Sequence, residues 1–125
     1  MAWGGLEERM YRNLALAVVA GVLVPAVALA HHGWSSYDAE KLIKVTAPLT
    51  DVAWRNPHGT AKVVYQKKTW DVILAPVARM EDRGLTPQML GPGKAVTLEG
   101  YPRRDGTPEM RIERIVAGGK TVELR

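Results

Sequence analysis

The feature that most constrains this chain is an uncharged apolar run over residues 14–30. Arg9 and Arg12 precede the run, and Ala28-Leu29-Ala30 closes it with small residues at the positions that signal peptidase reads. A retained membrane anchor is the competing interpretation, but 17 residues are near the minimum that spans about 30 Å of hydrocarbon, and Pro25 shortens the helix further. We expect cleavage after Ala30, export to the periplasm by the general secretory route, and no membrane span in the mature protein.

Two acidic residues, Glu7 and Glu8, stand where a signal peptide should be basic. Translation from Met10 would instead give the basic lead Met10-Tyr11-Arg12. Both Met1 and Met10 are therefore candidate starts, and cleavage after Ala30 is expected from either one.

The composition limits what the mature chain can do. The formal net charge is +4 and stays +4 after cleavage, because residues 1–30 contain two arginines and two glutamates. This surplus favours acidic partners but is too small to indicate a nucleic-acid binder. The absence of cysteine excludes disulfides, thiolate metal sites and a cysteine nucleophile. An exported domain of this size must then depend on its apolar core or on a bound ligand.

The first part of the mature chain has the pattern of strands. Apolar and polar residues alternate over 42–54, and the phase reverses near Thr50-Asp51, which predicts one long strand with a bulge. A hairpin is predicted next, with strands over 61–65 and 70–74 joined at Lys67-Lys68.

The second part adds helical turns and further strands. Pro76 suits the first turn of a short helix, and Gly84 suits the position just after its end. A second helical turn is predicted over 86–90, and strands around 96–99 and over 109–116 and 121–125. The order of three strands, a helix and two or three strands predicts an OB-like antiparallel barrel of five to six strands over residues 41–125. A generic small antiparallel barrel or an α+β roll is the alternative.

The three histidines suggest a metal site. His31 and His32 stand at the expected new amino terminus, and His58 lies in the turn Asn56-Pro57-His58-Gly59. A terminal histidine offers its α-amine and Nδ1 as a chelate, and His58 or His32 would complete a three-nitrogen set. Such ligands favour Cu(II), with Zn(II) as the next candidate. Asp38 would orient an imidazole or bind the metal itself.

Each of these residues also has a purely structural interpretation. Adjacent histidines at a free terminus are often unstructured, a turn histidine usually makes surface hydrogen bonds, and Asp38 suits a solvated loop. Trp34 and Tyr37 would either shield a metal or, more commonly, pin the terminal segment to the domain.

The aromatic and basic residues of the strands suggest a second kind of function. Trp54, Tyr65 and Trp70 are interleaved with lysines and arginines, a mixture that OB surfaces use for ligands. Export argues against nucleic acid, so an acidic, lipid-headgroup or saccharide ligand is the alternative to metal. The alternating positions of these rings favour core packing over a ligand platform. Nothing in the pattern points to a particular partner protein.

The residues offer little for catalysis. Ser35 and Ser36 are the only serines, and neither lies in a nucleophile-elbow context. No glycine-rich phosphate loop is present. We therefore expect a binding protein rather than an enzyme.

Several motifs taken together resemble DUF6152, a family of small exported bacterial proteins of unknown function. The shared motifs are His31-His32, Tyr37-Asp38, Asn56-Pro57-His58, Pro92-Gly93 and Val96 followed by Gly100. This chain has Tyr37 where family members more often have phenylalanine, and Gly33-Trp34 where a serine is frequent. The resemblance implies export and a β-fold, and it raises the expectation that the three histidines act together.

Overall fold

The computed structural model describes residues 33–125. The predicted signal peptide and the pair His31-His32 lie outside the described residues. No helix within 33–125 is long and apolar enough to span a membrane.

Seven strands, one short helix and two 3-10 turns follow one another in the described part of the chain. They are η3 (Trp34–Ser36), β1 (Ile43–Pro48), β2 (Thr50–Ala53), β3 (Thr60–Tyr65), β4 (Lys68–Ile73), α2 (Val77–Asp82), η4 (Pro87–Leu90), β5 (Ala95–Pro102), β6 (Glu109–Ala117) and β7 (Lys120–Glu123). The predicted short helix between the hairpin and the later strands is confirmed, as is the mainly β class.

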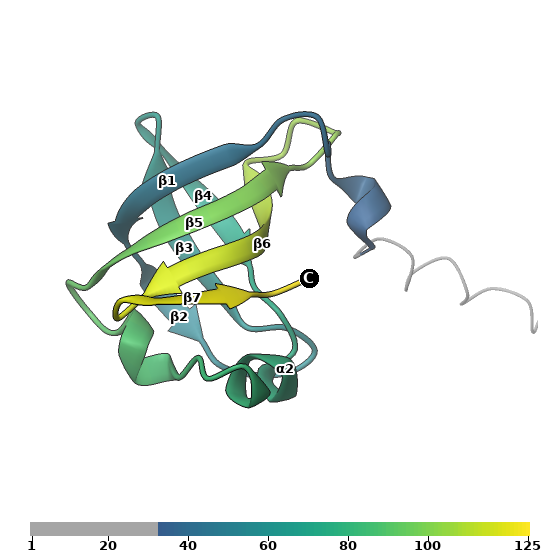
Figure 1. Cartoon of the computed structure of the whole chain (residues 1–125). Helices are drawn as coiled ribbons and strands as arrows, with labels where there is room; N and C mark the ends of the chain where they lie inside the picture. Colours follow the sequence, from purple (N-terminus) through teal and green to yellow (C-terminus); the bar gives the residue numbers. More distant parts are fainter. Residues whose placement is uncertain (1–32) are drawn as a thin grey trace, which may run out of the picture. The chain divides into compact units, whose positions relative to one another are not determined.

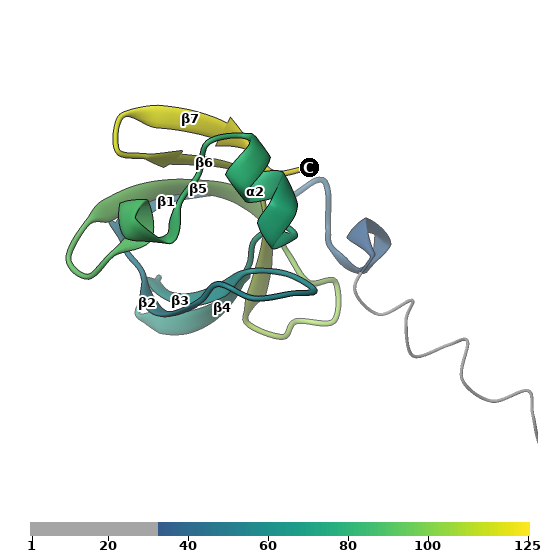
Figure 2. The same cartoon turned by 90° about the horizontal axis from the view of Figure 1, so that it is seen from below.

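The strands form one mixed sheet that curls strongly into a half-barrel (Figures 1 and 2). Its order is β1-β5-β6-β4-β3-β2, with β7 added beside β6. The first and last strands of this order, β1 and β2, are consecutive in the chain and separated only by Leu49. One bent strand therefore contributes to both ends of the curled sheet.

The prediction that the whole sheet is antiparallel is wrong for one pair of strands. β4 and β6 run parallel, with Val72 opposite Met110. Alternation of apolar residues gives the face of a strand but not its direction, and only a tight turn forces its two strands to be antiparallel. The long connection from β4 through α2, η4 and β5 lets β6 enter in the same direction as β4.

The bulge predicted in the first strand is present. Thr50 pairs with Lys62 and Ala53 with Thr60, so two residues of β2 oppose one residue of β3. Asp51 has φ 48°, in the left-handed region that non-glycine residues rarely adopt.

The hairpin turn between β3 and β4 lies one residue earlier than predicted. Its central residues are Gln66 and Lys67, with φ 50° and 63°, rather than Lys67 and Lys68. Positive φ at both central residues is the geometry that matches the twist of a two-residue hairpin.

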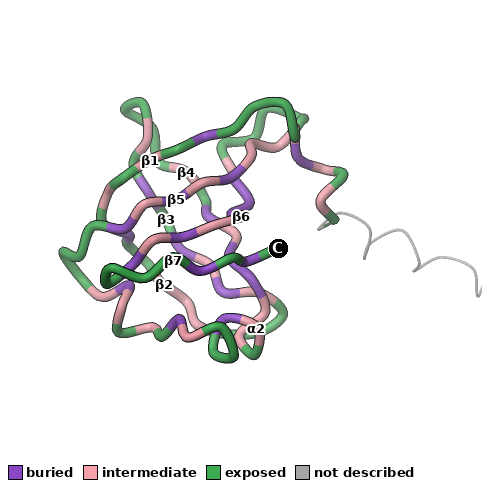
Figure 3. The backbone as a smooth tube through the Cα atoms, viewed as in Figure 1, coloured by how far each residue is buried: buried purple, intermediate pink, exposed green. Residues whose placement is uncertain are grey.

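The core is one cluster of buried residues that come mainly from six of the strands, α2 and η4, and Figure 3 shows the buried parts of the chain in purple. Val72, Met110 and Ile112 are completely buried at its centre. Met80 of α2 is also fully buried, and a Cβ added to Gly59 would lie 2.6 Å from its Cε. Gly59 donates to the Ala75 carbonyl at 2.9 Å, so glycine at this position lets the β2–β3 loop pack against the helix.

Gly100 allows an equally close approach inside the sheet. A Cβ at this position would overlap the backbone carbonyl of Arg111 on β6, which cannot move aside without breaking the β5–β6 pairing. We predict that Gly100→Ala lowers the free energy of unfolding by about 1–3 kcal/mol, the usual range for overpacking. Urea denaturation measures this change. Gly91→Ala is the control, because Gly91 has φ −61° and meets only the Gln88 carbonyl, at 3.1 Å. Equal stability of the two variants would contradict the prediction.

Candidate functional site

The segment that follows the histidine pair is held on the domain by Trp34. The guanidinium carbons of Arg111 and Arg125 lie 4.5 and 4.6 Å from the centroid of its ring. Tyr37 and Tyr101 meet the same ring edge to face, each with centroids 6.4 Å away. Both kinds of contact are attractive, because cations and ring edges carry positive charge toward the negative ring face.

Tyr37 is the second anchor of this segment. It is buried, and its hydroxyl donates to Glu109 Oε2 at 2.7 Å. Arg103 holds the same carboxylate oxygen at 3.3 Å and pairs with Asp105 at 3.1 Å. Burial and the bond to Glu109 raise the pKa of Tyr37, so the hydroxyl remains a donor. The prediction that Trp34 and Tyr37 pin the terminal segment to the domain is confirmed; we call their contacts the amino-terminal anchor.

The sequence pattern did not identify Arg111 as a partner of Trp34. Arg111 lies between two core residues of β6 and is only 8% exposed, although alternation places it on the outer face of the sheet. The anchor covers that face, so Arg111 is buried beneath Trp34. Burial lowers the pKa of Arg111. No local sequence signal indicates this stacking, because Trp34 and Arg111 lie far apart in the chain.

Asp38 follows the anchor directly. Its backbone N–H donates to the Pro102 carbonyl at 2.8 Å, which fixes the chain beside the end of β5. Its Oδ1 accepts from the Glu40 N–H at 3.1 Å, and its Oδ2 lies 3.9 Å from Lys41 Nζ. Asp38 thus organises the turn that leads into β1.

His58 lies in the loop between β2 and β3. The loop begins with the cis peptide Asn56-Pro57 and ends at Gly59, whose carbonyl accepts from the Leu74 N–H at 2.8 Å. His58 is partly buried. In both Figure 1 and Figure 2 this loop, η3 and the end of the chain at Arg125 lie toward the same side of the sheet.

The structure describes only two of the predicted metal ligands, His58 and Asp38. Within residues 33–125, no group of three histidine, aspartate or glutamate side chains is placed to hold a metal ion. His58 and Asp38 lie in separate segments, the β2–β3 loop and the turn before β1. His31 and His32 lie outside the described residues, so the complete ligand set stays a prediction.

The three strand aromatics pack against the core, as the alternation favoured. Trp54, Tyr65 and Trp70 are each partly buried against core residues. Tyr65 and Trp70 meet edge to face at 5.9 Å, and the Trp70 indole N–H donates to the Tyr65 carbonyl at 3.2 Å.

A small basic cleft lies beside Trp70. It has a volume of about 270 Å³, and its lining includes Trp70, Lys41, Arg103 and Arg104. Among residues 33–125, the buried Arg103 Nε has no hydrogen-bond partner. Asp38 also lines the cleft and lies 3.9 Å from Lys41, and Arg103 pairs with Asp105 and Glu109. The ring and the basic side chains suit an anionic group on a sugar or similar ligand that displaces these pairings.

Comparison with curated proteins finds no match to this chain. Residues 18–111, three quarters of its length, match a family of unknown function, DUF6152. The match extends from the apolar run through η3, the His58 loop and β5 into β6, and it confirms the resemblance seen in the motifs. The chain belongs to the DUF6152 family.

Proposed function

We propose that this chain is an exported, non-catalytic metal-binding protein that holds one Cu(II) at the amino terminus created by signal cleavage. The observation that carries the proposal is the amino-terminal anchor. Trp34 and Tyr37 are fixed on the domain, and only Gly33 separates Trp34 from His32. A ligand pair tied so closely to a rigid element loses less conformational entropy on binding than one on a free tail.

The chemistry of the ligands favours copper. The His31 α-amine and Nδ1 form a chelate, and a third nitrogen comes from His58 or His32. Nitrogen ligands with an open position suit Cu(II), and Zn(II) is the next metal in affinity. His58 is the stronger candidate for the third ligand, because its loop lies toward the same side of the sheet as η3 (Figures 1 and 2).

The scaffold in this proposal is an OB-like barrel. Its support is the pairing pattern: the two halves of the bent first strand pair with β5 and β3, and β6 lies between β5 and β4. A helix between β4 and β5 completes the order that the OB-like interpretation requires.

The basic cleft supports a second candidate function. Trp70, Lys41, Arg103 and Arg104 would bind the acidic group of a saccharide or a lipid headgroup in an exported binding module. The two candidates differ in the residues they require, because the cleft does not depend on a free His31 amine.

We predict that mature protein starting at His31 binds one Cu(II), and that one added amino-terminal alanine weakens binding by more than tenfold. The extension converts the amine into an amide, which removes a ligand and its chelate ring. Competition titration against a copper chelator measures both affinities, and EPR counts the nitrogen ligands. His58→Ala and His32→Ala, each in the mature protein, then identify the third ligand. Unchanged affinity in the extended protein would rule out the amino-terminal chelate.

We further predict that Asp38→Ala lowers copper affinity by about 10–100-fold, the usual loss when a group that orients a metal ligand is removed. Glu40→Ala is the matched control, because it removes an exposed carboxylate from the same turn and leaves the Asp38 side chain in place. The same titration measures both variants. Equal affinities would assign Asp38 to the turn alone.

A further inference from the structure

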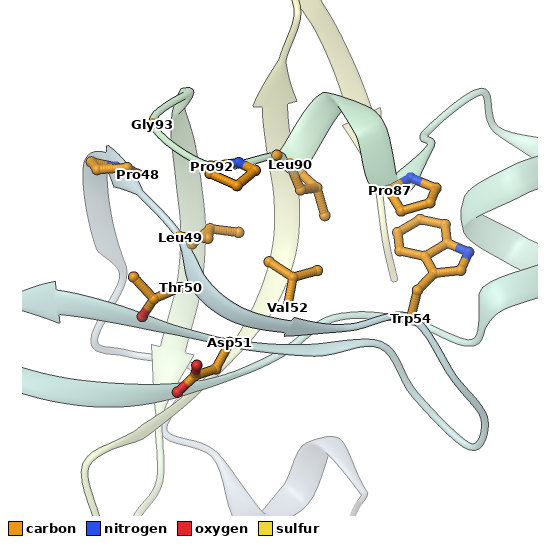
Figure 4. A pocket seen from close by; sticks show the side chains of 11 residues that line it. Pro48, Leu49, Thr50, Asp51, Val52, Trp54, Pro87, Leu90, Pro92 and Gly93 are labelled. Atoms are coloured by element: carbon orange, nitrogen blue, oxygen red, sulfur yellow. The ribbon is translucent and has the colours of Figure 1, made fainter.

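A pocket that the proposed metal site does not use opens at the bend of the first strand (Figure 4). Its volume is about 650 Å³, within the range of about 300–1,000 Å³ typical of small-molecule sites. One wall comes from the β1–β2 bend and the other from η4 and the loop before β5. Its main lining side chains are Leu49, Val52, Trp54, Pro87, Leu90 and Pro92.

The lining of the pocket is mainly apolar, although Thr50 and Asp51 are also among its residues. Leu49 and Leu90 are 3% and 1% exposed and are anchored in the core, whereas Val52 and Trp54 are only partly buried. Figure 4 shows that the side chains of Thr50 and Asp51 point away from the pocket. A charged ligand would lose its hydration here without gaining a partner, so the pocket favours an uncharged one.

Trp54 gives the pocket a fixed flat surface. Its indole N–H points to Glu81 Oε1 of α2, at 3.4 Å, and its ring stands beside Pro87 (Figure 4). The side chain is therefore held at its polar edge by the helix and backed by the core. A rigid aromatic face of this kind stacks well on a ring of the ligand.

The strand bulge lies among the residues that line the pocket. Asp51 and Val52 together oppose a single residue of β3, and a bulge leaves the extra residue out of the regular ladder of hydrogen bonds. Backbone N–H and C=O groups are among the polar groups that orient ligands in apolar pockets. Asp51 and Val52 both line the pocket, so we expect the polar contact of a ligand to be made with the backbone at this bulge.

We propose that this pocket binds a small, uncharged molecule with a ring-bearing apolar body and one hydrogen-bonding group. This inference does not rest on the copper site, and neither site shares a residue with the other.

Titration with N-phenyl-1-naphthylamine, an uncharged amine that carries a naphthyl and a phenyl group and fluoresces in apolar surroundings, tests the proposal. The wild-type domain should bind one molecule with a micromolar Kd and transfer energy from tryptophan to the probe. Val52→Phe fills the pocket and should weaken binding at least tenfold. Val64→Phe is the matched control, because Val64 is 63% exposed on β3 and does not line the pocket. Absence of probe binding, or equal weakening in both variants, would overturn the proposal.

Methyl NMR of the wild-type protein keeps the test independent of how the variants fold. The probe should shift the methyl resonances of Leu49, Val52 and Leu90 and leave those of Val64 unchanged. Shifts confined to other methyl groups would place the probe elsewhere and contradict the assignment. Copper affinity is measured in a separate titration. Failure of the probe to bind would therefore not bear on the copper site, and failure to bind copper would not bear on the pocket.

Discussion

The bend at Leu49 is the constraint on which the rest of this domain depends. On one side of it β1 pairs with β5, and on the other side β2 pairs with β3, so a single strand contributes to both ends of the sheet. The sheet must curl to allow this, and the curl encloses the core. Leu49 itself is buried at the turning point, with the bulge at Asp51 immediately after it. The bend also determines where the apolar pocket forms and where the β2–β3 loop with His58 emerges.

A second set of contacts gives the domain its distinctive amino terminus. Terminal segments are commonly mobile unless specific contacts hold them. Here Trp34 lies against two guanidinium groups, and the buried hydroxyl of Tyr37 donates to a carboxylate that Arg103 also holds. These interactions connect the first described residues to β6, the loop before it and the end of the chain. Residues that follow the predicted export signal are thereby made part of the folded structure, which would give the proposed copper site a rigid support.

Much of the fold could be predicted from the sequence, because a strand that is buried on one face shows alternating apolar and polar residues. Alternation predicted strands over 42–54, around 96–99 and over 109–116, and each of these segments does carry buried apolar residues. They are Ile43 and Leu49, Val96 and Leu98, and Met110 and Ile112. Alternation does not indicate the direction of a strand, so the parallel pairing of β4 and β6 was not predicted. The predicted hairpin turn lay one residue too late in the chain. Gln66 adopts positive φ, and glutamine is not among the residue types that favour such turn positions.

The candidate site was harder to predict than the fold. The pinning role of Trp34 and Tyr37 was expected, but their partners were not, since Arg111 and Arg125 come from the far end of the sequence. Arg111 has the alternation of a solvent-facing residue and is buried only because η3 covers it. The apolar pocket likewise depends on the approach of residues 87–93 to the bend, a tertiary contact without a local sequence signature.

The central claim is that the chain directly after the histidine pair is held rigidly on the domain. The most direct test is backbone ¹⁵N relaxation of the mature protein without metal. Our account predicts order parameters of about 0.85 for Trp34 and Tyr37, equal to those of the strands. Values below about 0.6 at these residues, with the strands remaining rigid, would show a free amino-terminal tail and contradict the account.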